Sequence, residues 1–244
     1  MNSRNAKERR RIFGETKIIL RDFLGQLLFK NYVGQYSLQI IDIKKIKRST
    51  IFFPTAKIPF TVVNFERSRF EMINAIGRFH VSLVNITKNS TEIDNVINYS
   101  RACYTFRHGI PPELTGEAFW YLKNAEVGYY FDNISDYKKF TNRYVALNRL
   151  NQQVALERKL LSRKELNKRN FREKGGINVI QLSSGEYIWC GGGLHRLAIA
   201  NANHLSHIPV CVVFRDEELI QKRYFTKIFS KKLPQIYKKI YKYF

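Results

Sequence analysis

The sequence predicts an α/β protein, and three observations support this prediction. Short apolar segments typical of strands occur between longer segments with helical periodicity along the 244 residues. Residues 177–214 have the pattern of a strand, a second strand, a glycine turn, a helix and a final strand. The chain is 44% hydrophobic, which is enough to bury a core. We therefore expect a folded domain of strands and helices rather than a disordered chain.

In the N-terminal half the patterns predict several strands and then a helix. Four short apolar segments are predicted as strands: 37–43, 49–54, 61–65 and 79–86. Residues 91–109 have helical periodicity, and Gly109 followed by Pro111 and Pro112 predicts where this helix ends. The aromatic-rich segment 116–131 predicts a further helix and then a turn at Gly128.

Residues 143–174 are helical in pattern and strongly basic. Ser162 and Glu165 have the spacing of a capping box, and Gly175 is a predicted helix end, so we expect a break near residue 162. Between residues 147 and 174 there are nine basic and three acidic residues. This excess fits either a solvated helix face or a surface that meets phosphate groups.

The charge and the cysteines restrict the class of protein. The formal net charge is +22, which favours anionic partners such as nucleic acid, an acidic membrane surface or phosphorylated small molecules. Cys103, Cys190 and Cys211 do not have the close spacing of a metal site. Few cysteines and no uninterrupted apolar span predict a cytoplasmic protein, either soluble or peripheral on the inner face of the membrane.

The stretch CGGGLHR is the most specific motif in the chain. Gly191, Gly192 and Gly193 stand between a predicted strand and a predicted helix, where glycine allows the backbone to turn tightly and to approach a ligand closely. His195 and Arg196 follow in the first helical turn, whose exposed N–H groups and positive dipole end favour an anion. Arginine binds two phosphate oxygens at once, and histidine donates a hydrogen bond or transfers a proton. The other interpretation is a tight turn whose His and Arg are solvated.

Residues 186–214, EYIWCGGGLHRLAIANANHLSHIPVCVVF, resemble the ParB/sulfiredoxin-like superfamily. Members of that family carry a G…HR or GERR turn, an alanine-rich helix and an IPV strand. Residues 142–154, NRYVALNRLNQQV, are similar to the family's arginine-containing segment, and 37–43 resembles its first strand. An extra basic stretch stands where the family has a short link. The resemblance implies a mixed sheet with packed helices, here with basic helical N- and C-terminal extensions.

The family includes several activities, which the residues of this chain rank. Sulfiredoxins have a catalytic cysteine where this chain has Leu194, and Cys190 is expected to be a buried small side chain. ParB segregation proteins have two arginines in the turn and a helix-turn-helix reader, for which the residues after the IPV strand are too few. A third branch phosphorylates hydroxyl compounds with a nucleotide, and it fits this sequence best.

The resemblance therefore implies a nucleotide-dependent phosphotransferase, acting on a small or lipid- or sugar-linked hydroxyl compound. Its cofactors would be a nucleoside triphosphate (ATP or CTP) and Mg²⁺. Two alternatives remain: a nucleotide-responsive nucleic-acid-binding protein of the ParB type, and a nuclease.

Phosphoryl transfer needs a group that accepts the hydroxyl proton. The acidic candidates are Glu113, Glu117, Glu126 and Asp132. We predict Glu117 and His195 as catalytic residues, although an acid at a helix start also stabilises the helix dipole. The phosphates are expected at Gly191, Gly192, Gly193, His195 and Arg196. Arg143 joins them through its resemblance to the family's upstream arginine; no metal ligand is assigned.

Two basic extensions flank the predicted core domain of residues 36–220. Residues 1–35 contain a helix with an apolar face, and the tail 221–244 has eight basic residues and no acidic one. The tail predicts an amphipathic helix with Ile236, Ile240 and Phe244 on one face. It fits a membrane surface, a nucleic acid or packing on the core, and these three remain open.

Overall fold

The computed structural model describes residues 23, 29–30, 37–50, 80–81, 90–166, 176–216 and 221–222. The predicted strand at 61–65, most of the one at 79–86 and the helix end at Gly175 lie outside the described residues. So do the N-terminal helix, apart from residue 23, and the amphipathic helix of the tail.

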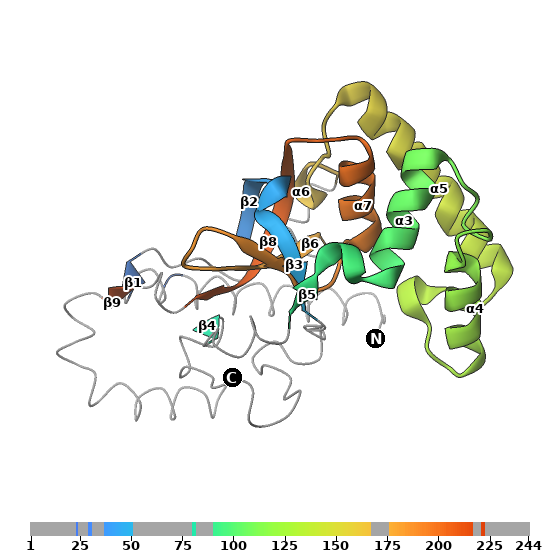
Figure 1. Cartoon of the computed structure of the whole chain (residues 1–244), viewed down its shortest axis with the longest axis horizontal. Helices are drawn as coiled ribbons and strands as arrows, with labels where there is room; N and C mark the ends of the chain where they lie inside the picture. The colour runs from blue at the N-terminus through green and yellow to red at the C-terminus, as the bar shows by residue number, and fades with distance from the viewer. Residues whose placement is uncertain are drawn as a thin grey trace, which may run out of the picture.

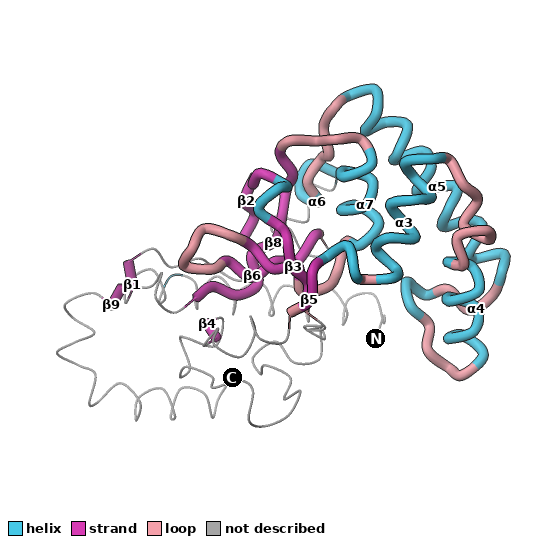
Figure 2. Tube along the Cα trace, viewed as in Figure 1, coloured by secondary structure: helices cyan, strands magenta, loops and turns pink. Residues whose placement is uncertain are grey.

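A mixed sheet forms the centre of the described part (Figures 1 and 2). Its strands are β2 (Ser37–Asp42), β3 (Ile46–Ser49), β4 (His80–Val81), β5 (Thr91–Glu92), β6 (Ile177–Gln181), β7 (Tyr187–Trp189) and β8 (His207–Asp216). The strand order is β2-β8-β6-β7-β3-β5, and β4 pairs with β8 off this path. The pairs β6–β8 and β3–β7 are parallel, whereas β2–β8 and β6–β7 are antiparallel. The prediction of an α/β protein is confirmed.

A second, two-stranded sheet joins β1 (Phe29–Lys30) and β9 (Gln221–Lys222) in antiparallel register. These strands lie just outside the two predicted limits of the core domain, so segments from the two extensions pair with each other.

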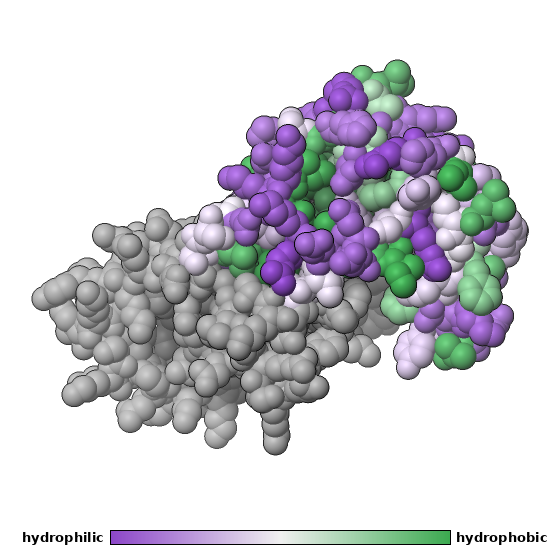
Figure 3. Space-filling model, in the orientation of Figure 1, coloured by the Kyte–Doolittle hydropathy of each residue, from purple (hydrophilic) through white to green (hydrophobic). Residues whose placement is uncertain are grey.

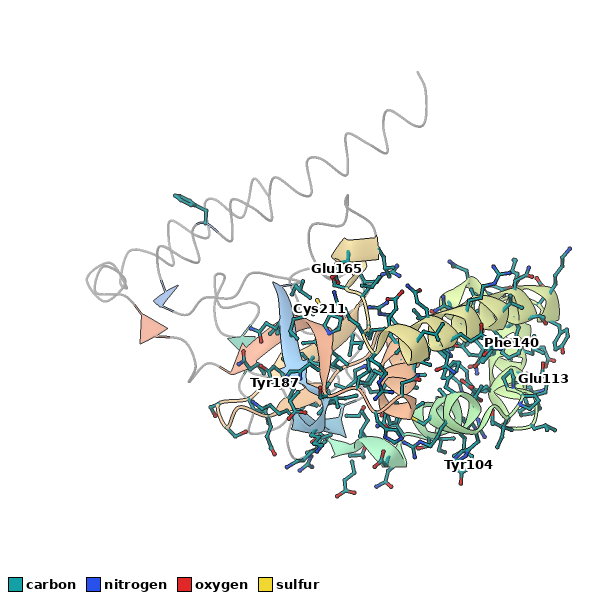
Figure 4. The ribbon with its side chains drawn as sticks, turned by 90° about the horizontal axis from the view of Figure 1, so that it is seen from above. Tyr104, Glu113, Phe140, Glu165, Tyr187 and Cys211 are labelled. Atoms are coloured by element: carbon teal, nitrogen blue, oxygen red, sulfur yellow. The ribbon has the colours of Figure 1, made fainter. Side chains whose placement is uncertain are left out.

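Most helices gather on one side of the main sheet, and the shortest, residues 163–166, lies apart from the others (Figures 1 and 4). They are α3 (Ile97–His108), α4 (Glu117–Glu126), α5 (Tyr137–Glu157), α6 (Arg163–Leu166) and α7 (Leu194–Ala202). Four side chains of α5, Phe140, Tyr144, Leu147 and Val154, are buried along one stripe of the helix. In Figure 4 the label of Phe140 lies among these helices and that of Tyr187 in the sheet.

Helix α7 is the central helix of this layer. Residues Leu197, Ala198, Ile199 and Ala200 are at most 1% exposed. Short alanine side chains allow the helix to lie close to its neighbours α3 and β6. The start of α7 is consequently held in a fixed position, which matters because His195 belongs to its first turn.

Three predicted boundaries are wrong. The helix predicted from residue 91 begins at Ile97, because Thr91 and Glu92 form β5 beside β3. The strand predicted from residue 49 lies earlier, at Ile46–Ser49, with residues 51–54 outside the described part. Helix α5 starts before residue 143, because Asp136 caps it by accepting a hydrogen bond from the backbone N–H of Lys139.

The predicted break near residue 162 is confirmed. Helix α5 ends at Glu157, and the backbone N–H of Ser162 donates to Oε2 of Glu165 at 2.6 Å. The backbone N–H of Glu165 donates to Oγ of Ser162 at 3.1 Å, which completes a capping box at the start of α6. Gly109 ends α3 in the left-handed region, and Gly128 forms the predicted turn. No helix within the described ranges combines the length and the apolar character needed to cross a bilayer.

Candidate functional site

The glycine turn connects β7 to α7, as predicted. Gly191, Gly192 and Gly193 all have positive φ values, of 91°, 74° and 61°. A Cβ atom on Gly193 would lie 2.8 Å from the backbone of Ile177, and one on Gly192 would lie 2.6 Å from Nδ2 of Asn178. These two glycines therefore allow a close approach to the protein's own chain at β6. This packing accounts for them without a ligand.

His195 extends from the start of α7 into the helical layer, where it is 3% exposed. Its Nε2 atom lies 3.3 Å from the hydroxyl of Tyr144 on α5. The ring of Tyr121 stacks on the imidazole with centroids 6.2 Å apart, and Phe106 meets it edge-on at 6.3 Å. Three helices thus fix the orientation of this histidine.

Glu117 is the first residue of α4 and is 2% exposed. Its Oε1 atom lies 3.4 Å from Nε2 of His195. Its Oε2 atom accepts a hydrogen bond of 3.2 Å from the hydroxyl of Thr105 on α3. The structure therefore brings the two residues predicted as catalytic into contact, inside the protein. A buried carboxylate beside an imidazole is an arrangement suited to proton transfer.

Asp132 and Arg143 connect this buried pair to the surface. Oδ2 of Asp132 lies 3.9 Å from Nδ1 of His195, 3.5 Å from Nη2 of Arg143, and accepts a hydrogen bond of 3.2 Å from Tyr121. The side chains of Arg143 and Asp132 are 41% and 44% exposed. Arg143, predicted at the site, is thus joined to His195 through Asp132.

Asp132 was one of four acidic candidates in the sequence, but its position beside His195 was not predicted. Its backbone has a φ of 52°, which is uncommon for a residue other than glycine. Asn133 follows with a φ of 61°, so two successive non-glycine residues are left-handed. The turn that contains them places the Asp132 carboxylate at the site.

Arg196 has a different environment from His195. It is 7% exposed, and Nη2 of its guanidinium donates a hydrogen bond to the carbonyl of Leu161 in the connection between α5 and α6. This contact ties that connection to the start of α7. The hydrogen bond of Arg196 is thus with the connection between α5 and α6, whereas the contacts of His195 are with α3, α4 and α5.

Burial sets the proton states of the phenols and thiols around the site. It raises the pKa of Tyr144 and of Tyr121 well above the ordinary value of 10; the Glu117 carboxylate raises both further, and the Asp132 carboxylate also raises that of Tyr121. Both hydroxyls therefore keep their protons and can donate hydrogen bonds. Burial also raises the pKa of Cys190 well above that of an ordinary thiol, which fits the expectation of a small buried side chain rather than a reactive one.

The other predicted candidates lie outside this group of contacts. Glu113 accepts a hydrogen bond from Tyr137 at the exposed start of α5, and Glu126 pairs with Lys123 at the end of α4. In Figure 4 Glu113 lies at the outer end of the helical layer. Within the described ranges, no three His, Cys, Asp or Glu side chains are arranged as a metal site.

Aromatic side chains lie next to two residues of the site along the chain. Trp120 and Phe131 lie next to Tyr121 and Asp132 in the sequence, with ring centroids 4.8 Å apart. Phe131, in the turn after α4, is 42% exposed, and Phe119 on α4 is 69% exposed. Figure 3 shows mostly hydrophilic residues on the visible face of the described part, with apolar residues scattered among them. Exposed aromatic rings near a charged group are suited to binding a planar ligand.

Comparisons with protein-family profiles, with curated proteins and with solved structures find no match to this chain. The resemblance to the ParB/sulfiredoxin-like superfamily therefore stays a prediction from the sequence.

Proposed function

We propose that this protein is a nucleotide-dependent phosphotransferase that acts on a small or lipid- or sugar-linked hydroxyl compound. The observation that carries this proposal is the contact between Glu117 and His195, 3.4 Å apart and both almost fully enclosed. Two predicted site residues from separate motifs meet at one place, and Asp132 connects His195 to the exposed Arg143.

In the proposed reaction the oxygen of the acceptor hydroxyl attacks the terminal phosphorus of the nucleotide, and Glu117 accepts the proton of that hydroxyl. The bond between that phosphorus and the leaving phosphate oxygen breaks, and the rest of the nucleotide departs. The Nε2 atom of His195 lies beside the Glu117 carboxylate and takes over the proton that Glu117 accepts. Thr105 fixes the other carboxylate oxygen by its hydrogen bond.

Two features support phosphate as the transferred group. Arg143 lies at the exposed part of the site, and its planar guanidinium is suited to hold two phosphate oxygens. The net charge of +22 attracts anions to the whole molecule. Trp120 and Phe131 provide rings on which a nucleobase could stack.

Magnesium fits this proposal as a companion of the nucleotide. Mg²⁺ is commonly held by substrate phosphates, waters and one or two carboxylates rather than by a dedicated protein cage. Because no three His, Cys, Asp or Glu side chains of the described residues form a metal site, the ion would be held mainly by the phosphates of the nucleotide. When bound, the ion would neutralise charge on the phosphates.

Phosphorus NMR on the full chain tests the proposal. The protein is mixed with Mg²⁺, with ATP or CTP, and with sets of alcohols, sugars and lipid-linked hydroxyl compounds. We expect nucleotide consumption only with an acceptor, together with a new phosphomonoester signal. Consumption that is stimulated by duplex DNA without any acceptor would instead favour the ParB-type alternative, and cleavage of DNA would favour a nuclease.

A further inference from the structure

Three groups share one oxygen atom at the exposed part of the site. Oδ2 of Asp132 faces Tyr121 at 3.2 Å, Arg143 at 3.5 Å and His195 Nδ1 at 3.9 Å. Hydrogen bonds between oppositely charged nitrogen and oxygen groups are ordinarily about 2.7–2.9 Å long. The carboxylate is therefore fully engaged with neither Arg143 nor His195, and it lies between them.

The ion pair between Asp132 and Arg143 restrains the Asp132 carboxylate only weakly. Both side chains are more than two-fifths exposed, and they face each other at 3.5 Å through one pair of atoms. Exposed ion pairs contribute little, because water and salt screen them. A phosphate offers the same guanidinium two charge-assisted hydrogen bonds, so it can replace Asp132 there.

The contact with His195 lies in a different environment. The imidazole is 4% exposed, and Glu117 occupies its opposite nitrogen at 3.4 Å. A carboxylate that moves about 1 Å nearer would form an ordinary hydrogen bond with Nδ1. In that bond Nδ1–H donates to Asp132, so the neutral ring keeps its proton on Nδ1 and Nε2 is left free to accept a proton from Glu117.

We propose that Asp132 is a positioning residue for His195. Arg143 keeps the Asp132 carboxylate away from His195 until a phosphate group binds to Arg143. The phosphate takes the guanidinium from Asp132, and the released carboxylate closes on Nδ1 of His195. The left-handed backbone of Asp132 (φ 52°) places the side chain at this junction. This proposal rests on the proposed function only in taking the phosphate to be that of the substrate.

The test uses the full chain with nitrogen-15-labelled histidine, titrated with inorganic pyrophosphate. The ring nitrogens of His195 are identified by comparison with His195→Gln. In the wild type, we expect pyrophosphate to shift the His195 signals. Arg143→Gln should lose at least about tenfold in pyrophosphate affinity, the consequence of removing a charged hydrogen-bonding group. Arg149→Gln, at an exposed arginine of the same helix, should behave as the wild type.

Asp132→Asn separates this proposal from a purely structural role. Removing the competing carboxylate should tighten pyrophosphate binding by up to about fivefold, the strength of an exposed ion pair. In Asp132→Asn, the nitrogen-15 signals of His195 should stay unchanged when the protein is saturated with pyrophosphate. If Arg143→Gln does not fold, Arg143→Lys, which keeps the charge, should bind more weakly and still shift His195.

Weaker pyrophosphate affinity in Asp132→Asn would overturn the proposal, as would a His195 response that persists in that variant. No response in the wild type would overturn it too. None of these measurements needs turnover, so a pyrophosphate response without phosphoryl transfer would support this inference and count against the proposed function.

Discussion

The Nε2 atom of His195 lies 3.4 Å from Oε1 of Glu117, and the two side chains are 4% and 3% exposed. Each is also held by a hydroxyl from another helix, Tyr144 for the histidine and Thr105 for the glutamate. A carboxylate would be costly to bury without such partners. The arrangement therefore keeps a polar group inside the protein in a fixed position, which stability alone does not require.

Removing the Tyr144 hydroxyl should destabilise the protein. In Tyr144→Phe the buried His195 loses a hydrogen-bond partner, and we expect the free energy of unfolding to fall by about 1–3 kcal/mol. Tyr137→Phe is the matched control, since its hydroxyl binds Glu113 at the surface, and it should change stability by less than about 0.5 kcal/mol. Urea unfolding of both variants measures the difference. Equal effects would show that the buried hydroxyl has no special role.

Gly193→Ala should be more harmful than Gly185→Ala. Both glycines have positive φ, so a side chain at either position costs about 1–2 kcal/mol. At Gly193 the new Cβ would also lie 2.8 Å from the Ile177 backbone, whereas at Gly185 it meets nothing within 4 Å. Overpacking adds about 1–3 kcal/mol at Gly193. Denaturant midpoints compare the two, and similar losses would contradict the close packing on β6.

The capping box predicts a specific pH dependence. Hydrogen bonds from Lys159 and Ser162 lower the pKa of Glu165 from 4.5 to about 2. Because the folded-state pKa is depressed, the contribution is complete above pH 4.5 and is lost as the pH falls towards 2. The stability difference between the wild type and Glu165→Gln should therefore shrink over that range. Unfolding measured at pH 6 and near pH 3 tests this, and a constant difference would contradict it.

The cysteines of the core should be unreactive in the folded protein. The thiolate is the form that reacts, and burial raises the pKa of Cys103 to about 11 and that of Cys190 well beyond the ordinary range. We expect neither to be alkylated by iodoacetamide at pH 7.5 until the chain is unfolded. Mass spectrometry of the native and unfolded protein provides the comparison. Rapid native labelling of Cys190 would restore thiol chemistry of the sulfiredoxin type as a candidate.

Local signals account for the parts of the fold that the sequence predicts well. Two such signals are the capping box of Ser162 with Glu165 and the helix end at Gly109 before two prolines. Each involves only residues that are close together in the sequence, so it can be recognised without knowing the fold. The strand β5 could not be read in this way. Thr91 and Glu92 become extended because they pair with β3, which is distant in the sequence.

In the site too, local signals indicate single residues, whereas the contacts between residues distant in the sequence cannot be predicted. The sequence indicates Glu117 by its place at a helix start and His195 by the glycine turn before it. No pattern in the sequence gives the distance between these two residues. Asp132 was missed as a neighbour of His195 because its position depends on two left-handed residues that are not glycines. The glycine turn predicts space for a ligand, and the sequence gives no sign that Gly192 and Gly193 also lie against the chain at residues 176–178.

Phosphorus NMR of Glu117→Gln tests the central claim most directly. The glutamine side chain is close in size to the glutamate that it replaces, but it cannot accept the hydroxyl proton as a carboxylate does. Glu113→Gln, at the surface, is the matched control. We predict that the wild type and Glu113→Gln form a phosphomonoester from nucleotide and acceptor, and that Glu117→Gln does so at least about 100-fold more slowly. Phosphoryl transfer by Glu117→Gln at the wild-type rate would contradict the account.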